Sequence, residues 1–174
     1  MHSPDHLTSL ALSAREGDDR SIEQLVRLTQ PDVWRVCAAL GSDGEVEDLV
    51  SETYMRALRS LPSFRGESSV RTWLLTIARN VCADHVRARV RSRRLMGRLR
   101  LHATESVDNG PSYTDDLLGS LDPDRREAFQ LTQVAGLSYA EAAELLDVPV
   151  GTIRSRVARA RLDLRTAVDI AEAN

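Results

Sequence analysis

Two stretches rich in arginine give this chain its most evident chemical capacity. Between Arg65 and Arg100 there are ten arginines against two acids, a formal balance of +8, and between Gly151 and Arg165 there are five against one, a balance of +4. The segment between them, Leu101 to Pro149, carries ten acids against two arginines, a balance of −8. Guanidinium groups bind phosphate and release counterions, so this pattern suits DNA binding. On charge alone, a solvated arginine-rich helix face explains it equally well.

The residue types that catalysis or metal binding would need are scattered. Four histidines lie too far apart to form a ligand set, and Cys37 and Cys82 lie on apolar helical faces without CxxC spacing. Buried, reduced thiols are therefore expected in place of a disulfide or a metal site. The chain also has no phosphate-binding glycine loop, paired-carboxylate set or nucleophile motif. The sequence predicts a binding protein that is not an enzyme and that needs no cofactor and no metal ion.

Apolar residues recur at helical spacing along most of the chain. They make up 42% of it, only 4% of the chain is aromatic, and no alternating apolar pattern typical of strands occurs. We therefore predict an all-α fold of two small helical domains, residues 5–96 and residues 115–170. A flexible linker at 97–114 joins them, because that segment combines glycine, proline and polar residues without helical periodicity.

The first domain is expected to form a bundle of helices. They are predicted at Asp5–Glu16, from Arg20 to Leu40 with Pro31 marking a break or a new first turn, at Glu45–Leu61, and from Val70 to the arginines at 91–94. Pro62 to Ser69 cannot continue a helix and should form a loop.

Two features of these helices bear on function. The helix at Glu45–Leu61 is expected to bury its apolar residues, Leu58 among them, and to leave Asp48 and Glu52 on a flanking acidic side. Trp34 and Trp73 each lie on the apolar stripe of a helix, so core packing is expected for both.

The second domain has an order of helices that is typical of DNA-binding domains. Ser138 and Glu141 form a capping box at the start of a short helix over Tyr139–Leu146, and a tight turn and a longer arginine-rich helix follow. This arrangement is typical of a helix-turn-helix. The core stripe of the longer helix is predicted as Ile153, Val157, Ala160 and Leu164. An ordinary helical hairpin with a solvated arginine face is the alternative.

Several blocks of sequence, in the same order, resemble the extracytoplasmic-function (ECF) sigma factors, small bacterial members of the sigma-70 family. Residues 48–57 (DLVSETYMRA) are similar to the region-two helix that docks on the polymerase clamp, and residues 64–66 (FRG) with 72–80 (TWLLTIARN) to the loop and helix that read the minus-ten element. Residues 121–128 (LDPDRREA), 136–141 (GLSYAE) and 148–161 (VPVGTIRSRVARAR) are similar to region four. The resemblance runs from about Leu10 to Arg165.

The resemblance implies roles for particular residues. Polymerase binding would fall to Asp48, Leu49 and Glu52. Minus-ten DNA, with one base unstacked, would be bound by Phe64, Arg65, Gly66, Asn80, Arg87 and Arg91. The minus-thirty-five element would be bound by Thr152, Arg154, Ser155 and Arg159. Two positions depart from the family pattern: Ser51 replaces a glutamine of the clamp contact, and Ala158 replaces a larger side chain that can reach DNA.

The resemblance also implies a function and partners. The chain would bind core RNA polymerase and direct initiation at promoter DNA with minus-ten and minus-thirty-five elements, and the sequence leaves an anti-sigma factor open as a further partner. We expect it in the cytoplasm, since neither a membrane span nor a signal peptide is evident. The alternative is a helix-turn-helix transcriptional regulator that is not a polymerase subunit. Such a protein would not need the acidic helix or the block from Phe64 to Asn80.

Overall fold

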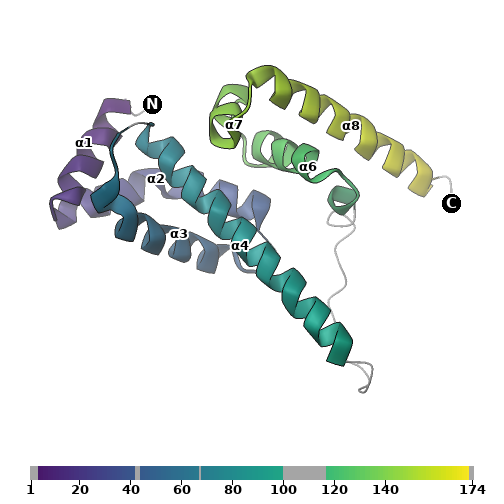
Figure 1. Cartoon of the computed structure of the whole chain (residues 1–174). Coiled ribbons are helices and arrows are strands. Elements are labelled where there is room, and N and C mark those ends of the chain that lie inside the picture. The colour runs from purple at the N-terminus through teal and green to yellow at the C-terminus, as the bar shows by residue number, and fades with distance from the viewer. Residues whose placement is uncertain (1–3, 42–43, 67, 100–116, 173–174) are drawn as a thin grey trace. The chain divides into compact units, whose positions relative to one another are not determined.

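The computed structural model describes residues 4–41, 44–66, 68–99 and 117–172 of the 174-residue chain. All regular structure in these residues is helical, which confirms the all-α prediction (Figure 1). The elements are α1 (Pro4–Arg15), α2 (Asp19–Leu40), α3 (Val46–Ser60), η1 (Leu61–Ser63), α4 (Val70–Leu99), α6 (Pro123–Phe129), η3 (Gln130–Val134), α7 (Tyr139–Leu146) and α8 (Val150–Glu172). None of the described helices is long and apolar enough to cross a membrane.

The chain divides into two compact units, Met1–Val86 and Arg87–Asn174, with the division inside α4. Of the linker expected at 97–114, residues Gly97 to Leu99 form the last turn of α4, and the others lie outside the described residues. The helix therefore continues beyond the arginines at 91–94, where the sequence predicts its end.

α2 begins at a capped turn and continues past a proline. Gly17 has a φ of +93°, which turns the chain after α1, and the Asp18 carboxylate accepts a hydrogen bond from the Ser21 hydroxyl. The break predicted at Pro31 is wrong, because α2 runs without interruption from Asp19 to Leu40. Proline removes one backbone donor, and at this exposed position water can satisfy the carbonyl that loses its partner.

The core of the first unit lies between α2, α3 and α4. Its most deeply buried side chains include Val33, Val36, Cys37, Thr53, Leu74, Ala78, Val81 and Cys82. Both cysteines are buried and free of disulfides, as the sequence predicts. A hydrogen bond to Cys37 and burial raise the pKa of the Cys82 thiol, so this thiol stays protonated and unreactive at neutral pH.

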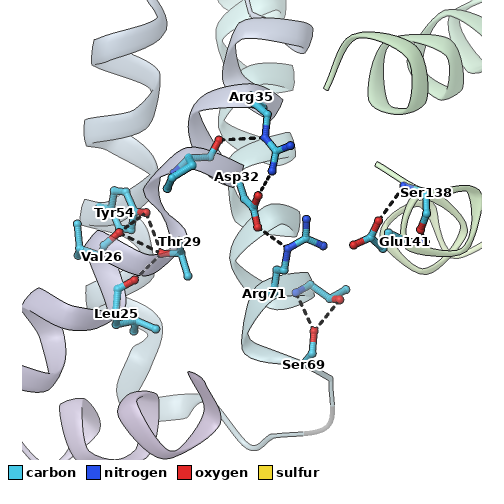
Figure 2. Close-up of polar contacts among 12 residues, drawn as sticks. Leu25, Val26, Thr29, Asp32, Arg35, Tyr54, Ser69, Arg71, Ser138 and Glu141 are labelled. Atoms are coloured by element: carbon cyan, nitrogen blue, oxygen red, sulfur yellow. Dashed lines mark hydrogen bonds and ion pairs between the residues drawn. The ribbon is translucent and has the colours of Figure 1, made fainter. Parts of the chain in front are cut away.

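A buried polar contact connects α2 to α3 (Figure 2). The Thr29 hydroxyl donates to the Leu25 carbonyl at 2.7 Å, and its oxygen lies 2.9 Å from the hydroxyl oxygen of Tyr54. Burial raises the pKa of Tyr54 to about 12, so the phenol remains neutral and able to donate. The contact satisfies two polar groups inside the bundle and fixes the register of α3 against α2.

A second apolar cluster joins α1 to the loop that follows α3. It consists of Ala11, Ala14, Leu25, Leu61, Phe64 and Val70, with Leu7, Ile22 and Trp73 packed against it. The ring centroids of Phe64 and Trp73 lie 5.0 Å apart with the planes at 50°, a favourable geometry for two aromatic rings. The cluster therefore anchors both the loop at Phe64 and the first turn of α4.

Two residues predicted to be buried lie on the surface. Trp34 is 41% exposed and Leu58 is 39% exposed. Each follows another apolar residue, Val33 and Ala57, which are buried in its place. Adjacent helical positions differ by about 100°, so only one residue of each pair can face the core, and composition does not reveal which one.

In the second unit, α6 and α7 both pack against α8. The Asp122 carboxylate accepts hydrogen bonds from two backbone N–H groups of the first turn of α6, and Pro123 occupies the first helical position, where no donor is needed. α6 continues into the π-helical turn η3, in which the Ala135 N–H donates to the Gln130 carbonyl at 2.9 Å. The core includes Leu121, Ala128, Leu131, Ala142, Ile153, Val157 and Ala160.

Candidate nucleic-acid and protein interfaces

α7 and α8 form the predicted helix-turn-helix. Ser138 Oγ accepts from the Glu141 N–H at 3.2 Å, and Glu141 Oε2 accepts from the Ser138 N–H at 2.7 Å, which completes the capping box (Figure 2). Asp147 ends α7 with a φ of +52°, a conformation that a short polar side chain tolerates. The cap fixes the start of α7, and the turn at Asp147 sets the direction in which α8 begins relative to α7.

The α8 residues assigned to DNA lie in its first three turns. Arg154, Ser155 and Arg159 are exposed, and Thr152 is half-buried. The Ser155 hydroxyl donates to the Thr152 carbonyl at 2.9 Å. Neither Arg154 nor Arg159 has a side-chain partner among the residues that the structure describes. Both guanidinium groups can therefore bind phosphate or a base edge without breaking an internal contact.

Other arginines of this unit hold α8 against α6 and η3. Arg156 forms an ion pair with Asp124, and Arg161 Nη2 lies 2.5 Å from Gln133 Oε1. A third contact has the arginine on α6 and the acid on α8, since Arg125 Nη1 lies 2.7 Å from Asp163 Oδ2. The arginines of α8 thus form two sets with different roles. Sequence reasoning missed this division, although helical phase places Arg156 and Arg161 at the borders of the apolar stripe.

The polymerase-binding residues predicted on α3 differ in exposure. Asp48 is exposed, and Glu52 is half-buried with its Oε1 2.7 Å from Nε of Arg56. Leu49 is only 3% exposed, and its side chain would collide with a Cβ at Gly41. This side chain therefore packs α3 against the turn after α2, and the assignment of Leu49 to polymerase binding stays a prediction.

The outer face of α3 is also more apolar than the sequence predicts. Met55 and Leu58 are exposed beyond the acidic residues, and Ser51 is exposed between them. Met55 lies seven residues after Asp48, so the two share one side of the helix. The sequence did contain a signal for this face, because the helix has more apolar residues than one buried stripe can hold.

The loop residues predicted to bind minus-ten DNA also differ from one another in exposure. Phe64 is only 5% exposed, and its carbonyl accepts from Arg15 Nη1 at 3.4 Å. At this exposure its ring belongs to the core and can shape a base pocket from below, so its assignment to minus-ten DNA stays a prediction. Arg65 and Gly66 are exposed, and Gly66 has a φ of +73°, which a residue with a side chain would adopt only with strain.

The predicted minus-ten residues of α4 share one side of that helix. Asn80, Arg87 and Arg91 are exposed, and spacings of seven and eleven residues place Arg87 and Arg91 each within about 20° of Asn80 around the axis. An amide and two guanidinium groups in a row offer hydrogen bonds to a base edge and charge to a phosphate chain.

Part of the positive charge counted in the first arginine stretch is internal to the fold. Arg71 of α4 and Arg35 of α2 both pair with the Asp32 carboxylate (Figure 2). Burial disfavours ionisation of Asp32, but the hydrogen bonds and charges of Arg71 and Arg35 outweigh it and hold the pKa of that carboxyl below its ordinary value. Arg71 therefore joins α4 to α2, and charge counting alone overestimates what is available to DNA.

Comparison with known proteins places both units in one family. The model of Sigma-70 region 2 matches residues 25–92, and that of Sigma-70, region 4 matches residues 113–164. Among solved structures, CnrH in complex with the cytosolic domain of CnrY is 29% identical with a TM-score of 0.68, covering 92% of this chain and 96% of that one. The sigma factor RpoE in complex with the anti-sigma factor NepR from Bartonella quintana is 32% identical with a TM-score of 0.61, covering 85% and 96%.

Curated relatives are similar over nearly the whole length. The probable RNA polymerase sigma-C factor of Mycobacterium bovis is 47% identical over 161 residues, which cover 89% of this chain and 87% of the relative. The ECF RNA polymerase sigma-E factor of Haemophilus influenzae is 33% identical over 177 residues, which cover 90% and 93%. The two helical units, the helix-turn-helix and these relatives together show that the chain belongs to the ECF RNA polymerase sigma factors of the sigma-70 family.

Proposed function

We propose that this ECF sigma factor binds core RNA polymerase through the outer face of α3 and recognises promoter DNA through two surfaces, one on α4 with the loop before it and one on α8. Promoter-specific initiation follows from its family and from the two matched regions. The polymerase supplies the chemistry, and the chain contributes binding and recognition, acting where the polymerase acts, in the cytoplasm.

The observation that carries the DNA-binding role most directly is the division of the α8 arginines. Arg156 and Arg161 hold the fold, whereas Arg154 and Arg159 point outward without partners among the described residues. A helix-turn-helix presents its second helix to the major groove, where arginine binds guanine in a bidentate manner. We therefore assign Arg154, Ser155 and Arg159 to the minus-thirty-five element and Thr152 to a neighbouring phosphate.

The polymerase-binding role is assigned to the acidic and apolar face of α3. Asp48 and Glu52 supply negative charge, and Met55 extends the face with exposed apolar surface. Such a face would repel DNA, but it is suited to a partner helix that carries basic and apolar residues. Leu49 supports this face from inside the fold.

Charge reversal tests the polymerase assignment. Replacing Asp48→Arg together with Glu52→Arg should weaken binding to core polymerase, measured by titration of labelled protein. The matched control is Glu16→Arg with Glu23→Arg, which makes the same charge change at two exposed acids, one in the turn after α1 and one in α2. Equal affinity for the two double variants would remove the assignment to α3.

The minus-ten role is assigned to Arg65, Gly66, Asn80, Arg87 and Arg91, with Phe64 shaping the loop from below. An extruded base costs a few kcal/mol, so a pocket that holds it affects promoter opening more than first binding. Permanganate footprinting on polymerase carrying Asn80→Ala should show reduced opening, with Val86→Ala, an exposed change on the same helix, as the control. Normal opening with Asn80→Ala would take this residue out of the site.

A regulator that is not a polymerase subunit is not favoured, because the region 2 match covers residues that such a protein does not need. Two solved relatives are held by partner proteins, one of them named as an anti-sigma factor. We propose a partner of that class for this chain as well, and pull-down of the purified chain against candidate anti-sigma domains tests it.

A further inference from the structure

One ion pair and one hydrogen bond connect α3 to α4. Arg56 Nη1 of α3 lies 2.7 Å from Asp84 Oδ2 of α4, and His85 Nε2, from the next residue of α4, lies 2.7 Å from Oε2 of Glu45 at the start of α3. Arg56 also makes a third contact, because its Nε lies 2.7 Å from Oε1 of Glu52. One guanidinium group is thus shared between a carboxylate on each helix.

The shared contact uses the geometry of arginine. Different nitrogens of the same planar group face Glu52 and Asp84, and an ammonium group could not hold two acceptors in fixed directions in this way. The three side chains remain 36–46% exposed. Solvent screens ion pairs of this kind, so they add little to the stability of the fold, and orientation is the larger part of what they contribute.

Arg56 lies between the two surfaces to which the proposed function assigns different partners. Glu52 belongs to the outer face of α3, and Asp84 lies one helical turn after Asn80 and three residues before Arg87. Fixing Asp84 therefore fixes the rotation and axial position of this part of α4 against α3. A shift of about 1 Å at such a site is enough to misplace a hydrogen-bonding group.

We propose that Arg56 is a positioning residue for promoter opening: by bridging Glu52 and Asp84 it holds the DNA-facing side of α4 at a fixed place relative to the polymerase-facing side of α3. This inference rests on the proposed function of those two surfaces. Arg56 itself contacts neither partner, and it acts through Asp84 on the placement of Asn80.

The test compares single and double variants of the full chain in complex with core polymerase. Arg56→Ala and Asp84→Asn should each reduce the rate of promoter opening about fivefold to tenfold, and the double variant should be no worse than either single one, because both remove the same contact. Arg56→Lys should recover only part of the rate. Arg27→Ala, a change of an exposed arginine on α2 outside both assigned surfaces, should open promoters normally.

Two readouts separate positioning from other roles. Core polymerase affinity and the thermal midpoint of the free chain should stay close to those of the unchanged protein for both single variants. A parallel loss of affinity, stability and opening would overturn the proposal in favour of a structural role. Normal or faster opening with Asp84→Asn would overturn it as well, because the role of Arg56 would then be to neutralise a carboxylate near DNA.

The proposed function itself is judged by Asn80→Ala in the same assay. If Asn80→Ala opens promoters poorly while Arg56→Ala opens them normally, the Arg56 proposal fails and the α4 site stands. If the Asn80→Ala variant also opens promoters normally, the assignment of minus-ten binding to α4 is wrong. The Arg56 proposal, which rests on that assignment, then fails with it.

Discussion

In α8 the residues assigned to DNA are distinct from those that hold the fold, whereas in the first unit the two groups overlap. Arg154 and Arg159 have no partners among the described residues, and Arg156 and Arg161 make the internal contacts. In the first unit, by contrast, Phe64 is part of the core.

The difference follows from how each surface is built. A single helix carries several faces at once, so one side of α8 can be apolar, its borders can bind α6 and η3, and the remainder can face a ligand. The minus-ten surface is assembled from a loop and a helix, and its parts must be held in place by residues of the same surface. Mutations should therefore separate folding from recognition throughout the second unit. In the first unit they should separate them only at exposed positions such as Arg65, and not at Phe64, which belongs to the core.

The largest effect is expected from Phe64→Ala. Removing this buried ring, which packs on Trp73, should destabilise the first unit by about 3–5 kcal/mol. Chemical denaturation followed by the fluorescence of the two tryptophans, both in this unit, measures it. Arg65→Ala at the exposed neighbouring position should change stability by less than about 0.5 kcal/mol. Similar stability for the two variants would break the comparison.

Next in size is the effect of Arg154→Ala with Arg159→Ala. If these residues read bases, each change should cost about 1–3 kcal/mol of discrimination between matched and scrambled minus-thirty-five duplexes and leave stability unchanged. Titrations at several salt concentrations distinguish this from phosphate binding, which would lower affinity for all sequences alike. Arg156→Ala with Arg161→Ala is the matched control and should keep the sequence preference.

A smaller effect is expected from Ser138→Ala. Loss of the cap on α7 should destabilise the second unit by about 1 kcal/mol without altering which duplex is preferred. Hydrogen exchange of the α7 amides measures the loss, and Glu144→Ala, an exposed change on the same helix, should leave it unchanged. A changed duplex preference would show that recognition in this unit also depends on its fold.

The smallest effect is expected from Asp32→Asn and depends on pH. The pKa of Asp32 is lowered in the folded chain, so its carboxylate contributes stability above the ordinary value of 3.8, and this contribution is lost as pH falls through the folded pKa. The variant should be less stable than the unchanged protein by under about 1 kcal/mol at neutral pH, with the gap closing in acid. Gln30→Ala, a change at an exposed position of the same helix that removes no ionisable group, should show no such closing in parallel denaturation curves.

The sequence predicts much of this fold because several signals are local. The capping box, the bounds of α7 and the buried stripe of α8 all follow from residues within a few positions of one another. The continuity of α2 through Pro31 does not follow from local signals, because tertiary packing overrides a residue that locally breaks helices.

The candidate surfaces are predicted less completely, for a related reason. Family resemblance assigns Leu49 to a polymerase-binding helix and Phe64 to a DNA-binding loop, but it does not say which side of the backbone each residue occupies. Pairs such as Arg71 with Asp32 join segments 39 residues apart, and no local pattern reveals them. Exposure and pairing are properties of the packed chain.

The π-helical turn η3 bears on where homologues of this chain can differ in length. An i→i+5 turn encloses one residue more than an α-helical turn, so the loss of a single residue from Gln130–Val134 would leave an ordinary helical turn. Homologues one residue shorter would close this segment as an ordinary helix and keep the apolar face of α6 in phase. We therefore expect insertions and deletions among homologues to gather here, and to be rare between Ser138 and Arg159, where a shift of one position would turn the arginine set away from DNA.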